Sequence, residues 1–399
     1  MAGIVIIGAG ECGVRAAFAL RELGFEGPLA LLGEEHGLPY ERPPLSKPAP
    51  AGPRAGPKPI RGEAAYAEAG VDFRPGTRAV GIDTDRKRVE LAGGSSLDYD
   101  RLLLATGARA RRFPGMEGCL TLRTGEDAAR IVPRFGKGAR VGIVGGGFIG
   151  LELAATARAA GAETTVVEAA PRLMARAVPA EIAGIVHRRH ESEGVEVRTG
   201  AAVASAGADE IVLGDGARLG FDLVVAGVGS LPETALAESA GIELENGVAV
   251  DGAFRTSAPD VFAAGDCCSF PWRGRRVRLE SWRAAQDQGA HVAAAMLGPV
   301  DDYVGVPWFW SDQYDLTLQV AGLFDPALEA LRRELADGAL LLFQRDGAGR
   351  LVAAAGVGTG NAVAKSVRLA EKLIERGAPV DATALEDPSV DLKRLLRGA

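Results

Sequence analysis

The fold is decided near the N-terminus by the stretch Ile4-Val5-Ile6-Ile7-Gly8-Ala9-Gly10-Glu11-Cys12-Gly13. Its continuous apolar run is typical of a strand buried on both faces, and the glycines that follow have the spacing G-x-G-x-x-G. Residues 14–23 have helical spacing and stop at Gly24, and the apolar run 29–32 leads to Glu34. This order predicts a dinucleotide-binding βαβ unit, in which the glycines admit the pyrophosphate, the helix N-terminus faces the phosphates and the acid binds the ribose hydroxyls.

The same unit recurs 137 residues further on, counted from Gly8 to Gly145. A strand is predicted over residues 141–144, a helix over 151–160 and a second strand over 164–168, and the turn after the first strand is Gly145-Gly146-Gly147-Phe148-Ile149-Gly150. A single such turn is a weak signal, and two ordinary α/β turns are the alternative explanation. Because both units carry their strands, helix and acid, the sequence favours two bound dinucleotides.

The acid of the second unit indicates which dinucleotide it binds. Glu168 lies 23 residues past Gly145, and a carboxylate there bonds both ribose hydroxyls but repels a 2′-phosphate. The sequence therefore favours NADH, with NADPH as the alternative because Arg172 lies just beyond.

Composition excludes several other classes of protein. The chain has 399 residues, of which 54 are glycine, and 45 Lys and Arg against 52 Asp and Glu give a net charge of −7. Nucleic-acid binding is not expected of an acidic chain, and no apolar run reaches the roughly 18 residues that span a bilayer. The four cysteines have no zinc spacing, so we expect no metal site and a reducing, cytoplasmic location.

Six further motifs identify a family. They are Leu38-Pro39-Tyr40-Glu41-Arg42-Pro43-Pro44-Leu45-Ser46-Lys47, Leu104-Ala105-Thr106-Gly107-Ala108-Arg109, Gly147-Phe148-Ile149-Gly150-Leu151-Glu152, Val261-Phe262-Ala263-Ala264-Gly265-Asp266, Glu280-Ser281-Trp282 and Val306-Pro307-Trp308-Phe309-Trp310-Ser311-Asp312-Gln313-Tyr314-Asp315. With these motifs, the chain resembles over nearly its full length the FAD-dependent NADH:ferredoxin reductases of bacterial Rieske oxygenase and cytochrome P450 systems. That family is part of the pyridine nucleotide-disulfide oxidoreductase superfamily.

The resemblance implies a glutathione-reductase-like α/β fold, with two nested Rossmann-like dinucleotide-binding domains and a small α+β C-terminal domain. The FAD-binding domain is expected over residues 1–111 and 246–315, the NADH-binding domain over 112–245 and the C-terminal domain over 316–399. In the last domain, strands are predicted at 340–343 and 351–355, joined by the Asp346-Gly347 hairpin signal. A helix is predicted over 362–376 and ends at Gly377.

The resemblance also implies where the cofactors bind. For FAD, Glu34 binds the adenosine ribose, Arg42 reaches the pyrophosphate and Asp266 accepts a hydrogen bond from the ribityl chain. The full FAD set is Gly8, Gly10, Gly13, Glu34, Arg42, Lys47, Ala105, Thr106, Gly107, Gly265, Asp266, Ser281 and Trp282. The NADH set is Gly145, Gly147, Phe148, Ile149, Gly150, Glu152, Glu168, Arg176 and Gly229.

Three residues are expected to take part in the chemistry. The resemblance places Lys47 beside the isoalloxazine and pairs it with Glu152, so that a fixed cation stabilises the anionic reduced flavin. The carboxylate orients the ammonium and avoids an unpaired buried charge. Trp282 is expected to line the nicotinamide and flavin face. A solvated lysine, an exposed helix glutamate and a core tryptophan are the alternative interpretations.

The implied function is that of a ferredoxin–NAD(+) reductase, active as a monomer or a homodimer. Hydride passes from NADH to FAD, and single electrons then pass to a [2Fe-2S] ferredoxin that feeds an oxygenase or a cytochrome P450. Disulfide reductases would need a dithiol near the flavin, usually two cysteines a few residues apart, and this sequence has no such pair. NADH oxidases and peroxidases would need one cysteine in the loop at 44–47, and no cysteine lies between Cys12 and Cys119. An apoptosis-factor-like flavoprotein shares the Pro-Pro-Leu-Ser-Lys loop but would need a transit peptide and a basic DNA-binding surface.

The chain departs from the family pattern at four places. Five prolines between residues 48 and 59 replace a helical stretch and predict an extended loop near the flavin edge. Glu233 stands where relatives have an asparagine and is a poorer N-cap, and Ala284 stands where many relatives have an asparagine. Gly358-Thr359-Gly360-Asn361 replaces an Asn-x-x-Arg-Asp type of turn.

The four histidines match no catalytic motif, and His187 and His190 are expected on a solvated helix face beside Arg188 and Arg189. The basic run 273–278 is either a solvated edge or a docking patch for an acidic ferredoxin, steered by charge.

Overall fold

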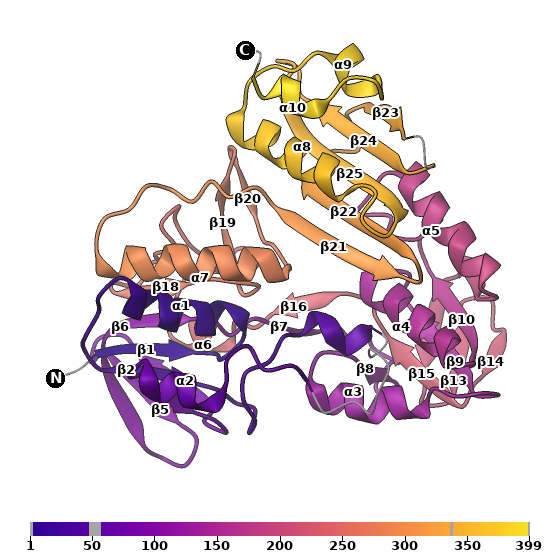
Figure 1. Cartoon of the computed structure of the whole chain (residues 1–399). Coiled ribbons are helices and arrows are strands. Elements are labelled where there is room, and N and C mark those ends of the chain that lie inside the picture. Colours follow the sequence, from indigo (N-terminus) through magenta and orange to yellow (C-terminus); the bar gives the residue numbers. More distant parts are fainter. Residues whose placement is uncertain (1–2, 48–56, 336–337, 398–399) are drawn as a thin grey trace. The chain divides into compact units, whose positions relative to one another are not determined.

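The computed structural model describes residues 3–47, 57–335 and 338–397, which form two compact units (Figure 1). The first unit consists of residues 3–42, 57–109 and 230–305, and the second of residues 43–47, 110–229, 306–335 and 338–397. Both units combine parallel strands with helices, so the predicted α/β class is confirmed. The predicted three-domain boundaries stay a prediction.

The first unit is built on a seven-stranded sheet. Its order is β3 (Asp72–Arg74), β2 (Leu29–Leu32), β1 (Gly3–Ile7), β6 (Ser96–Leu104), β5 (Arg88–Leu91) and β4 (Ala79–Asp83), and β18 (Val261–Ala263) also pairs with β6. The strands β3, β2, β1, β6 and β18 run parallel, whereas β5 and β4 add antiparallel pairs. All of β1 is buried, as its apolar run predicts.

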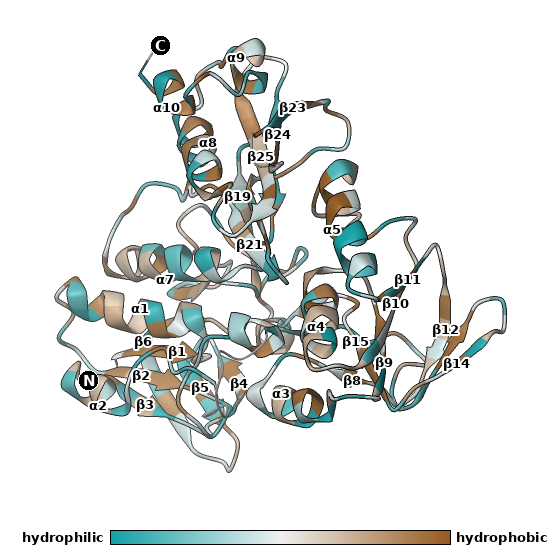
Figure 2. Ribbon diagram, turned by 45° about the vertical axis from the view of Figure 1, so that its right-hand side comes forward, coloured by the Kyte–Doolittle hydropathy of each residue, from teal (hydrophilic) through white to brown (hydrophobic). Residues whose placement is uncertain are grey.

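Two helices of this unit, α1 (Glu11–Glu22) and α7 (Trp282–Leu297), pack closely together. A Cβ on Gly289 would lie 2.6 Å from the Cys12 carbonyl oxygen, so a side chain there would push the helices apart. Hydrophilic and apolar residues alternate along α7, which has one buried face (Figure 2). The other elements are α2 (Glu63–Glu68), α6 (Ala235–Ser239), β7 (Ala108–Ala110), β16 (Ser230–Pro232), β17 (Val248–Ala249), β19 (Cys268–Trp272) and β20 (Arg275–Val277).

The second unit contains a five-stranded parallel sheet. Its order is β11 (Glu196–Thr199), β10 (Glu163–Glu168), β9 (Arg140–Val144), β15 (Leu223–Ala226) and β8 (Leu120–Thr121). Between β9 and β10 lies α4 (Phe148–Ala159), so the predicted strand, helix and strand are confirmed with shifted ends. The other elements are η1 (Pro43–Ser46), α3 (Gly125–Ile131), η2 (Val132–Arg134), α5 (Ala180–Ser192), β12 (Val203–Ala206), β13 (Glu210–Leu213) and β14 (Arg218–Gly220).

The same unit carries a five-stranded antiparallel sheet near the C-terminus. Its order is β21 (Trp308–Gln313), β22 (Leu316–Gly322), β25 (Leu351–Thr359), β24 (Leu340–Arg345) and β23 (Ala330–Glu334), followed by α8 (Ala364–Arg376), α9 (Ala382–Glu386) and α10 (Leu392–Leu395). The predicted hairpin strands and helix are confirmed. Gly377 ends α8 in the left-handed conformation, with φ +64°, which glycine adopts without strain.

No helix in residues 3–47, 57–335 and 338–397 is long and apolar enough to cross a membrane. The same residues contain no cluster of three or more His, Cys, Asp or Glu that could hold a metal ion. Residues 48–56, where most of the predicted proline-rich loop falls, lie outside the described residues.

Candidate functional site

The first glycine turn joins β1 to α1, and its three glycines differ in what surrounds them. Gly8 has φ +109°, and a Cβ on it would overlap the Ala105 carbonyl oxygen. A Cβ on Gly13 would overlap the Gly8 carbonyl oxygen. Packing of the protein therefore demands these two glycines. A Cβ on Gly10, in contrast, would meet no described atom within 4 Å, so the protein leaves this position open for the close approach of a ligand.

The second glycine turn, between β9 and α4, repeats this arrangement. Gly145 has φ +102° and faces the Gly227 carbonyl oxygen, and a Cβ on Gly150 would overlap the Gly145 carbonyl oxygen. A Cβ on Gly147 would touch only the Gly227 carbonyl oxygen, at 3.9 Å, among the described atoms. Each turn thus has two glycines fixed by packing and a middle glycine on an open side.

Both turns lead directly into a helix N-terminus. Gly10 and Gly147 are the N-caps of α1 and α4, and neither helix has a side-chain cap hydrogen bond among the described residues. The first N–H groups of a helix need partners, and their dipole favours an anion. These two termini fit the pyrophosphate of a dinucleotide.

The acids that follow the second strand of each unit have different surroundings. Glu168 Oε2 accepts from the Gly146 backbone N–H and Oε1 from that of Ala170, both at 2.7 Å, so this carboxylate is fixed at the glycine turn. Glu34 is exposed and lies 3.5 Å from Arg78. The next residue, Glu35, forms an ion pair with Arg42, in which Glu35 Oε1 lies 2.9 Å from Arg42 Nη2.

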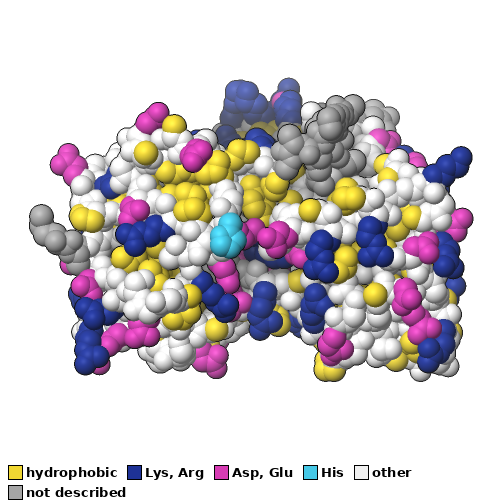
Figure 3. All heavy atoms as spheres, turned by 90° about the horizontal axis from the view of Figure 1, so that it is seen from below, with side chains coloured by type: hydrophobic (Ala, Val, Ile, Leu, Met, Phe, Trp, Pro, Cys, Tyr) yellow, Lys and Arg dark blue, Asp and Glu magenta, His cyan; other side chains and the backbone are white. Residues whose placement is uncertain are grey.

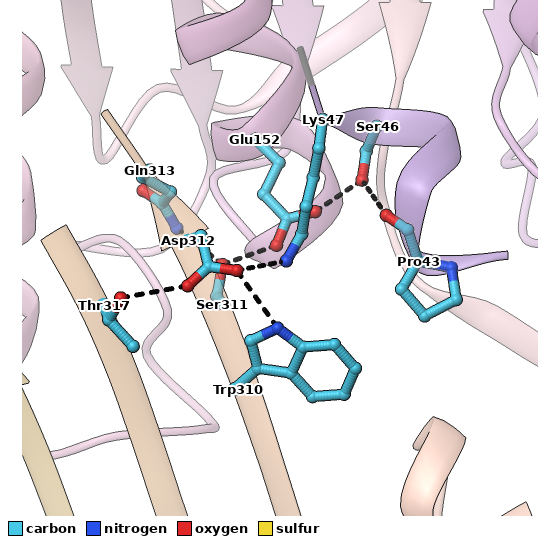
Figure 4. Close-up of polar contacts among 9 residues, drawn as sticks. All are labelled: Pro43, Ser46, Lys47, Glu152, Trp310, Ser311, Asp312, Gln313 and Thr317. Carbon is cyan, nitrogen blue, oxygen red and sulfur yellow. Dashed lines mark hydrogen bonds and ion pairs between the residues drawn. The ribbon is translucent and has the colours of Figure 1, made fainter. Parts of the chain in front are cut away.

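In the second unit, the Ser46–Lys47 segment meets α4 and β21 in a polar cluster (Figure 4). The Glu152 carboxylate accepts from Ser311 Oγ at 2.6 Å and from the Ser46 hydroxyl. One helical turn later, Thr156 Oγ1 donates to the Ser46 carbonyl oxygen at 2.7 Å. Two side chains of α4 thus bond Ser46, one at its hydroxyl group and one at its backbone carbonyl. These bonds fix the position of the next residue, Lys47.

The Lys47 ammonium completes this cluster. It donates to Asp312 Oδ2 at 2.6 Å and lies 5.0 Å from the ring centroid of Trp310. Glu152 is 7% exposed, and its burial raises the pKa of its carboxyl group. The charge of Lys47 and the hydrogen bonds from Ser311 and Ser46 lower that pKa, and the charge of Asp312 raises it.

Two models of known protein families match the chain. A model described as pyridine nucleotide-disulphide oxidoreductase matches residues 2–289. The chain belongs to this family. A second model, described as reductase C-terminal, matches residues 308–396. The predicted resemblance and the glutathione-reductase-like fold are confirmed, and the chain is an oxidoreductase that uses NAD and a flavin.

Relatives of this oxidoreductase cover it almost completely. It is 40% identical to the ferredoxin–NAD(+) reductase component of the anthranilate 1,2-dioxygenase system of Burkholderia cepacia, over 98% of each chain. It is 36% identical to putidaredoxin reductase of Pseudomonas putida, over 99% of this chain and 97% of the relative. Among solved structures, it matches the covalent putidaredoxin reductase–putidaredoxin complex with a TM-score of 0.93 and 34% identity, over 99% of this chain and 98% of that chain.

One predicted contact in this family member is wrong. The ion-pair partner of Lys47 is Asp312, and the two oxygens of Glu152 are taken by hydroxyl groups. The physical reason is burial: a hydroxyl satisfies a buried carboxylate without a second buried charge. Lys47 still acts on Glu152 through its charge.

The remaining residues predicted to bind FAD in the first unit belong to three short segments. Thr106 Oγ1 donates to the Glu233 carbonyl oxygen at 2.6 Å, and the Glu233 N–H donates to the Gly107 carbonyl oxygen at 2.9 Å. Gly265 follows β18 with φ +84°, and Asp266 next to it is half-buried. Ser281 caps α7 by accepting from the Ala284 N–H at 3.2 Å, and Trp282 begins that helix.

The other residues predicted to bind NADH lie around the second glycine turn. Phe148 and Ile149 are the first two residues of α4, and Ile149 is exposed. Phe148 packs against Phe309 with a ring-centroid separation of 5.0 Å. A Cβ on Gly229 would lie 3.9 Å from the Arg176 guanidinium, so these two predicted residues are neighbours.

Two smaller predictions need correction. His190 is fully buried and not on a solvated face, because α5 turns it toward Gln313 and Tyr314. Glu233 is not a cap residue, because the N-cap of α6 is Thr234; the Glu233 carboxylate instead lies 3.3 Å from Arg109.

The basic run 273–278 covers the turn after β19 and the β20 strand, and it is partly neutralised. Arg276 pairs with Glu245 at 2.9 Å and Arg278 with Glu280 at 2.5 Å, whereas Arg275 is exposed. On the face drawn in Figure 3, basic and acidic side chains are interspersed. The docking interpretation of this run stays a prediction.

Sequence reasoning missed several polar residues of the site. Ser311, Asp312 and Gln313 lie in a motif that served only to identify the family. Their alternation along β21 was the available signal, since Ser311 and Gln313 share its buried face. Glu11 was also missed. It is the first residue of α1 and accepts from Gln286 Nε2 at 2.8 Å, and burial raises the pKa of its carboxyl group.

Proposed function

We propose that this chain is an NADH-dependent ferredoxin reductase with FAD as its flavin, which delivers electrons to a [2Fe-2S] ferredoxin and through it to a Rieske oxygenase or a cytochrome P450. The observation that carries the proposal is the pair of glycine turns, each with one middle glycine open to a ligand. Two dinucleotides in one chain are what a flavin enzyme that oxidises a nicotinamide requires. The names of the two relatives and of the solved complex support the choice of electron acceptor.

The two turns take different dinucleotides in this proposal. The turn at 8–13 would hold FAD, with the α1 N-terminus at the pyrophosphate and the 105–107 and 265–266 segments in the same unit. The turn at 145–150 would hold NADH. Glu168 supports NADH over NADPH, because its carboxylate would repel a 2′-phosphate.

The protein positions the reactants and fixes the local charge. FAD, when bound, supplies the redox chemistry, because it accepts a hydride and releases electrons singly. Lys47 would supply a positive charge to the flavin, and Trp282 would shield the path of the hydride. Glu152 and Thr156 keep the Ser46–Lys47 segment in place, so the charge needs little reorganisation during the reaction.

The alternative of an NADH oxidase or peroxidase requires a reactive thiol. All four cysteines are buried free thiols, and burial raises the pKa of each one. A buried thiol with a raised pKa is a poor nucleophile. The free thiols also support the cytoplasmic location that we include in the proposal.

The experiment is steady-state NADH oxidation with cytochrome c as the final acceptor, measured with and without a [2Fe-2S] ferredoxin. We expect bound FAD to be released on denaturation and ferredoxin to stimulate cytochrome c reduction at least tenfold, as charge-steered docking of a specific partner allows. The same rate with and without ferredoxin would contradict the proposal. Hydrogen peroxide as the main product would favour the oxidase alternative.

A further inference from the structure

Four buried side chains of the second unit form one continuous chain of hydrogen bonds, whose inner end is drawn in Figure 4. Ser311 Oγ donates to Glu152 Oε1 at 2.6 Å, and Gln313 Nε2 donates to Ser311 Oγ at 3.0 Å. His190 Nε2 lies 2.8 Å from Gln313 Oε1. Ser311 and His190 are fully buried, and Gln313 is 3% exposed. These hydrogen bonds therefore link α5 to α4 through β21 by direct contacts between side chains.

The direction of these bonds follows from the carboxylate at the inner end. An ionised carboxylate only accepts, so the Ser311 proton points to Glu152 and the Ser311 oxygen accepts from the Gln313 amide. The Gln313 amide oxygen then faces His190, which must carry its proton on Nε2. Nδ1 is left as an acceptor, and the Tyr314 hydroxyl lies 3.1 Å from it. One neutral tautomer of His190 satisfies every bond.

The charged groups around both ends are consistent with this arrangement. Burial lowers the pKa of His190 to about 4, and the charges of His187 and Arg189 act in the same direction, whereas the bond to Gln313 and the charge of Glu193 oppose them. At the outer end, the Arg189 guanidinium lies 5.0 Å from the Tyr314 ring centroid and bonds Asp315 at 2.8 Å. At the inner end, the charge of Lys47 lowers the pKa of Glu152 and the charge of Asp312 raises it.

We propose that His190, Gln313 and Tyr314 are positioning residues, which hold the Glu152 carboxylate ionised and oriented beside the Ser46–Lys47 segment. None of the three was expected at the site from the sequence. The inference rests on the proposed function, because the state of Glu152 affects the reaction through Lys47. Interrupting this series of hydrogen bonds weakens the donors to Glu152, so the Glu152 carboxylate should take up a proton at higher pH.

The test is the pH dependence of flavin reduction by NADH, followed by rapid mixing of the FAD-loaded protein. His190→Phe should move the acidic limb of the profile up by about 0.2–0.5 pH unit, because the direct donors to Glu152 remain and lose only the strengthening that linked hydrogen bonds give one another. His190→Gln keeps an N–H toward Gln313 and should restore most of the wild-type profile. His187→Gln is the matched control, because His187 lies on the same helix but pairs with Glu191 outside the chain of bonds.

Gln313→Leu interrupts the same hydrogen-bond chain between Ser311 and His190 and replaces His190→Phe if that variant does not fold. A profile that overlays the wild type in the folded variants would overturn the inference. A shift as large in His187→Gln would also overturn it, because the effect would then come from the helix and not from the hydrogen bonds.

A second measurement needs no turnover. Nitrogen-15 spectra of the histidine-labelled protein contain the ring signals of four histidines. The signals that disappear in His190→Gln are those of His190. We expect a neutral ring protonated at Nε2 at pH 7, and an Nδ1-protonated or charged ring would contradict the proposed direction. If NADH fails to reduce the wild-type flavin, the proposed function fails. The tautomer of His190 still decides whether the hydrogen bonds run in the inferred direction.

Discussion

Lys47 Nζ lies 2.6 Å from Asp312 Oδ2, and this ion pair joins segments 265 residues apart in the sequence. The lysine side chain is 19% exposed and the aspartate 43%, so the pair is partly solvated. Asp312 is itself held by Trp310 Nε1 at 3.1 Å and Thr317 Oγ1 at 3.0 Å. The carboxylate that meets Lys47 is therefore fixed on the antiparallel sheet, and it orients the lysine without burying a second charge.

Substitutions at this pair should have unequal effects. Lys47→Gln removes the charge that would stabilise the reduced flavin and should slow flavin reduction by NADH about 100-fold, as the loss of one electrostatic donor does in other enzymes. Asp312→Asn leaves the cation in place and removes only a partly solvated pair, so we expect a loss of about fivefold or less. Rapid-mixing rate constants measure both. Equal losses would show that Lys47 acts only through its partner.

Glu152→Gln should separate stability from activity. Burial raises the pKa of folded Glu152 above its value in the unfolded chain, so its ionisation destabilises the fold as pH rises above that unfolded value. The glutamine variant lacks this penalty. We expect its free energy of unfolding, relative to wild type, to increase from pH 5 to pH 8, while flavin reduction slows about tenfold because Ser46 loses the carboxylate that it bonds and Lys47 loses a nearby negative charge. Urea titrations at the two pH values provide the test, and a relative stability independent of pH would contradict it.

Local sequence patterns predicted the elements of the two units better than the contacts between their side chains. The strand at 4–7, the strand at 29–32 and the glycine turns follow from apolar runs and backbone sterics, which depend on neighbouring residues alone. The partner of Lys47 could not be predicted in this way, because Glu152 and Asp312 both carry the required charge and only the packing of β21 distinguishes them. His190 was misjudged since its neighbours in sequence are polar, although its own position on α5 faces the protein interior.

Glu11 should make FAD binding depend on pH. It is the first residue of α1, and burial raises the pKa of its carboxyl group, while Gln286 and Trp282 act in the opposite direction. When ionised, it would repel a pyrophosphate at the same helix end. We expect Glu11→Gln to bind FAD about threefold to fivefold more tightly than wild type at pH 8, in line with charge effects at helix ends, and this difference to shrink as the pH falls and Glu11 takes up a proton. Reconstitution of the apoprotein followed by flavin fluorescence measures this, and Glu22→Gln on the exposed end of α1 is the control.

Glu168→Ala should weaken NADH binding without loss of FAD. The carboxylate accepts two backbone N–H groups at 2.7 Å, so its removal loosens the second turn in addition to deleting the ribose contact. We expect the KM for NADH to rise at least tenfold with kcat little changed, which is the pattern for a lost binding interaction. The FAD absorbance should be retained. Loss of the yellow colour with an unchanged KM would reverse the assignment of the two turns.

The middle glycines provide the sharpest test of the two cofactor sites. Gly10 has φ −78° and Gly147 φ −84°, both accessible to alanine, and a Cβ at either position has room in the protein. Gly10→Ala and Gly147→Ala should therefore fold, with a loss of about 1 kcal/mol from the poorer cap. The methyl group would instead occupy the space needed by a pyrophosphate. We expect Gly10→Ala to lose FAD during purification and Gly147→Ala to keep FAD but require at least tenfold more NADH, which follows if each lost phosphate contact is worth about 1.5–3 kcal/mol.

The controls for these variants are the third glycines, Gly13 and Gly150. Their added Cβ atoms would overlap the carbonyl oxygens of Gly8 and Gly145, so both alanine variants should fail to fold whether or not a cofactor is present. Thermal melting of all four proteins, with flavin content and NADH titration for those that fold, separates the two causes. If Gly147→Ala bound NADH like the wild type, the open side of that turn would not be the place where the dinucleotide approaches, and the second site would have to be sought elsewhere in the unit.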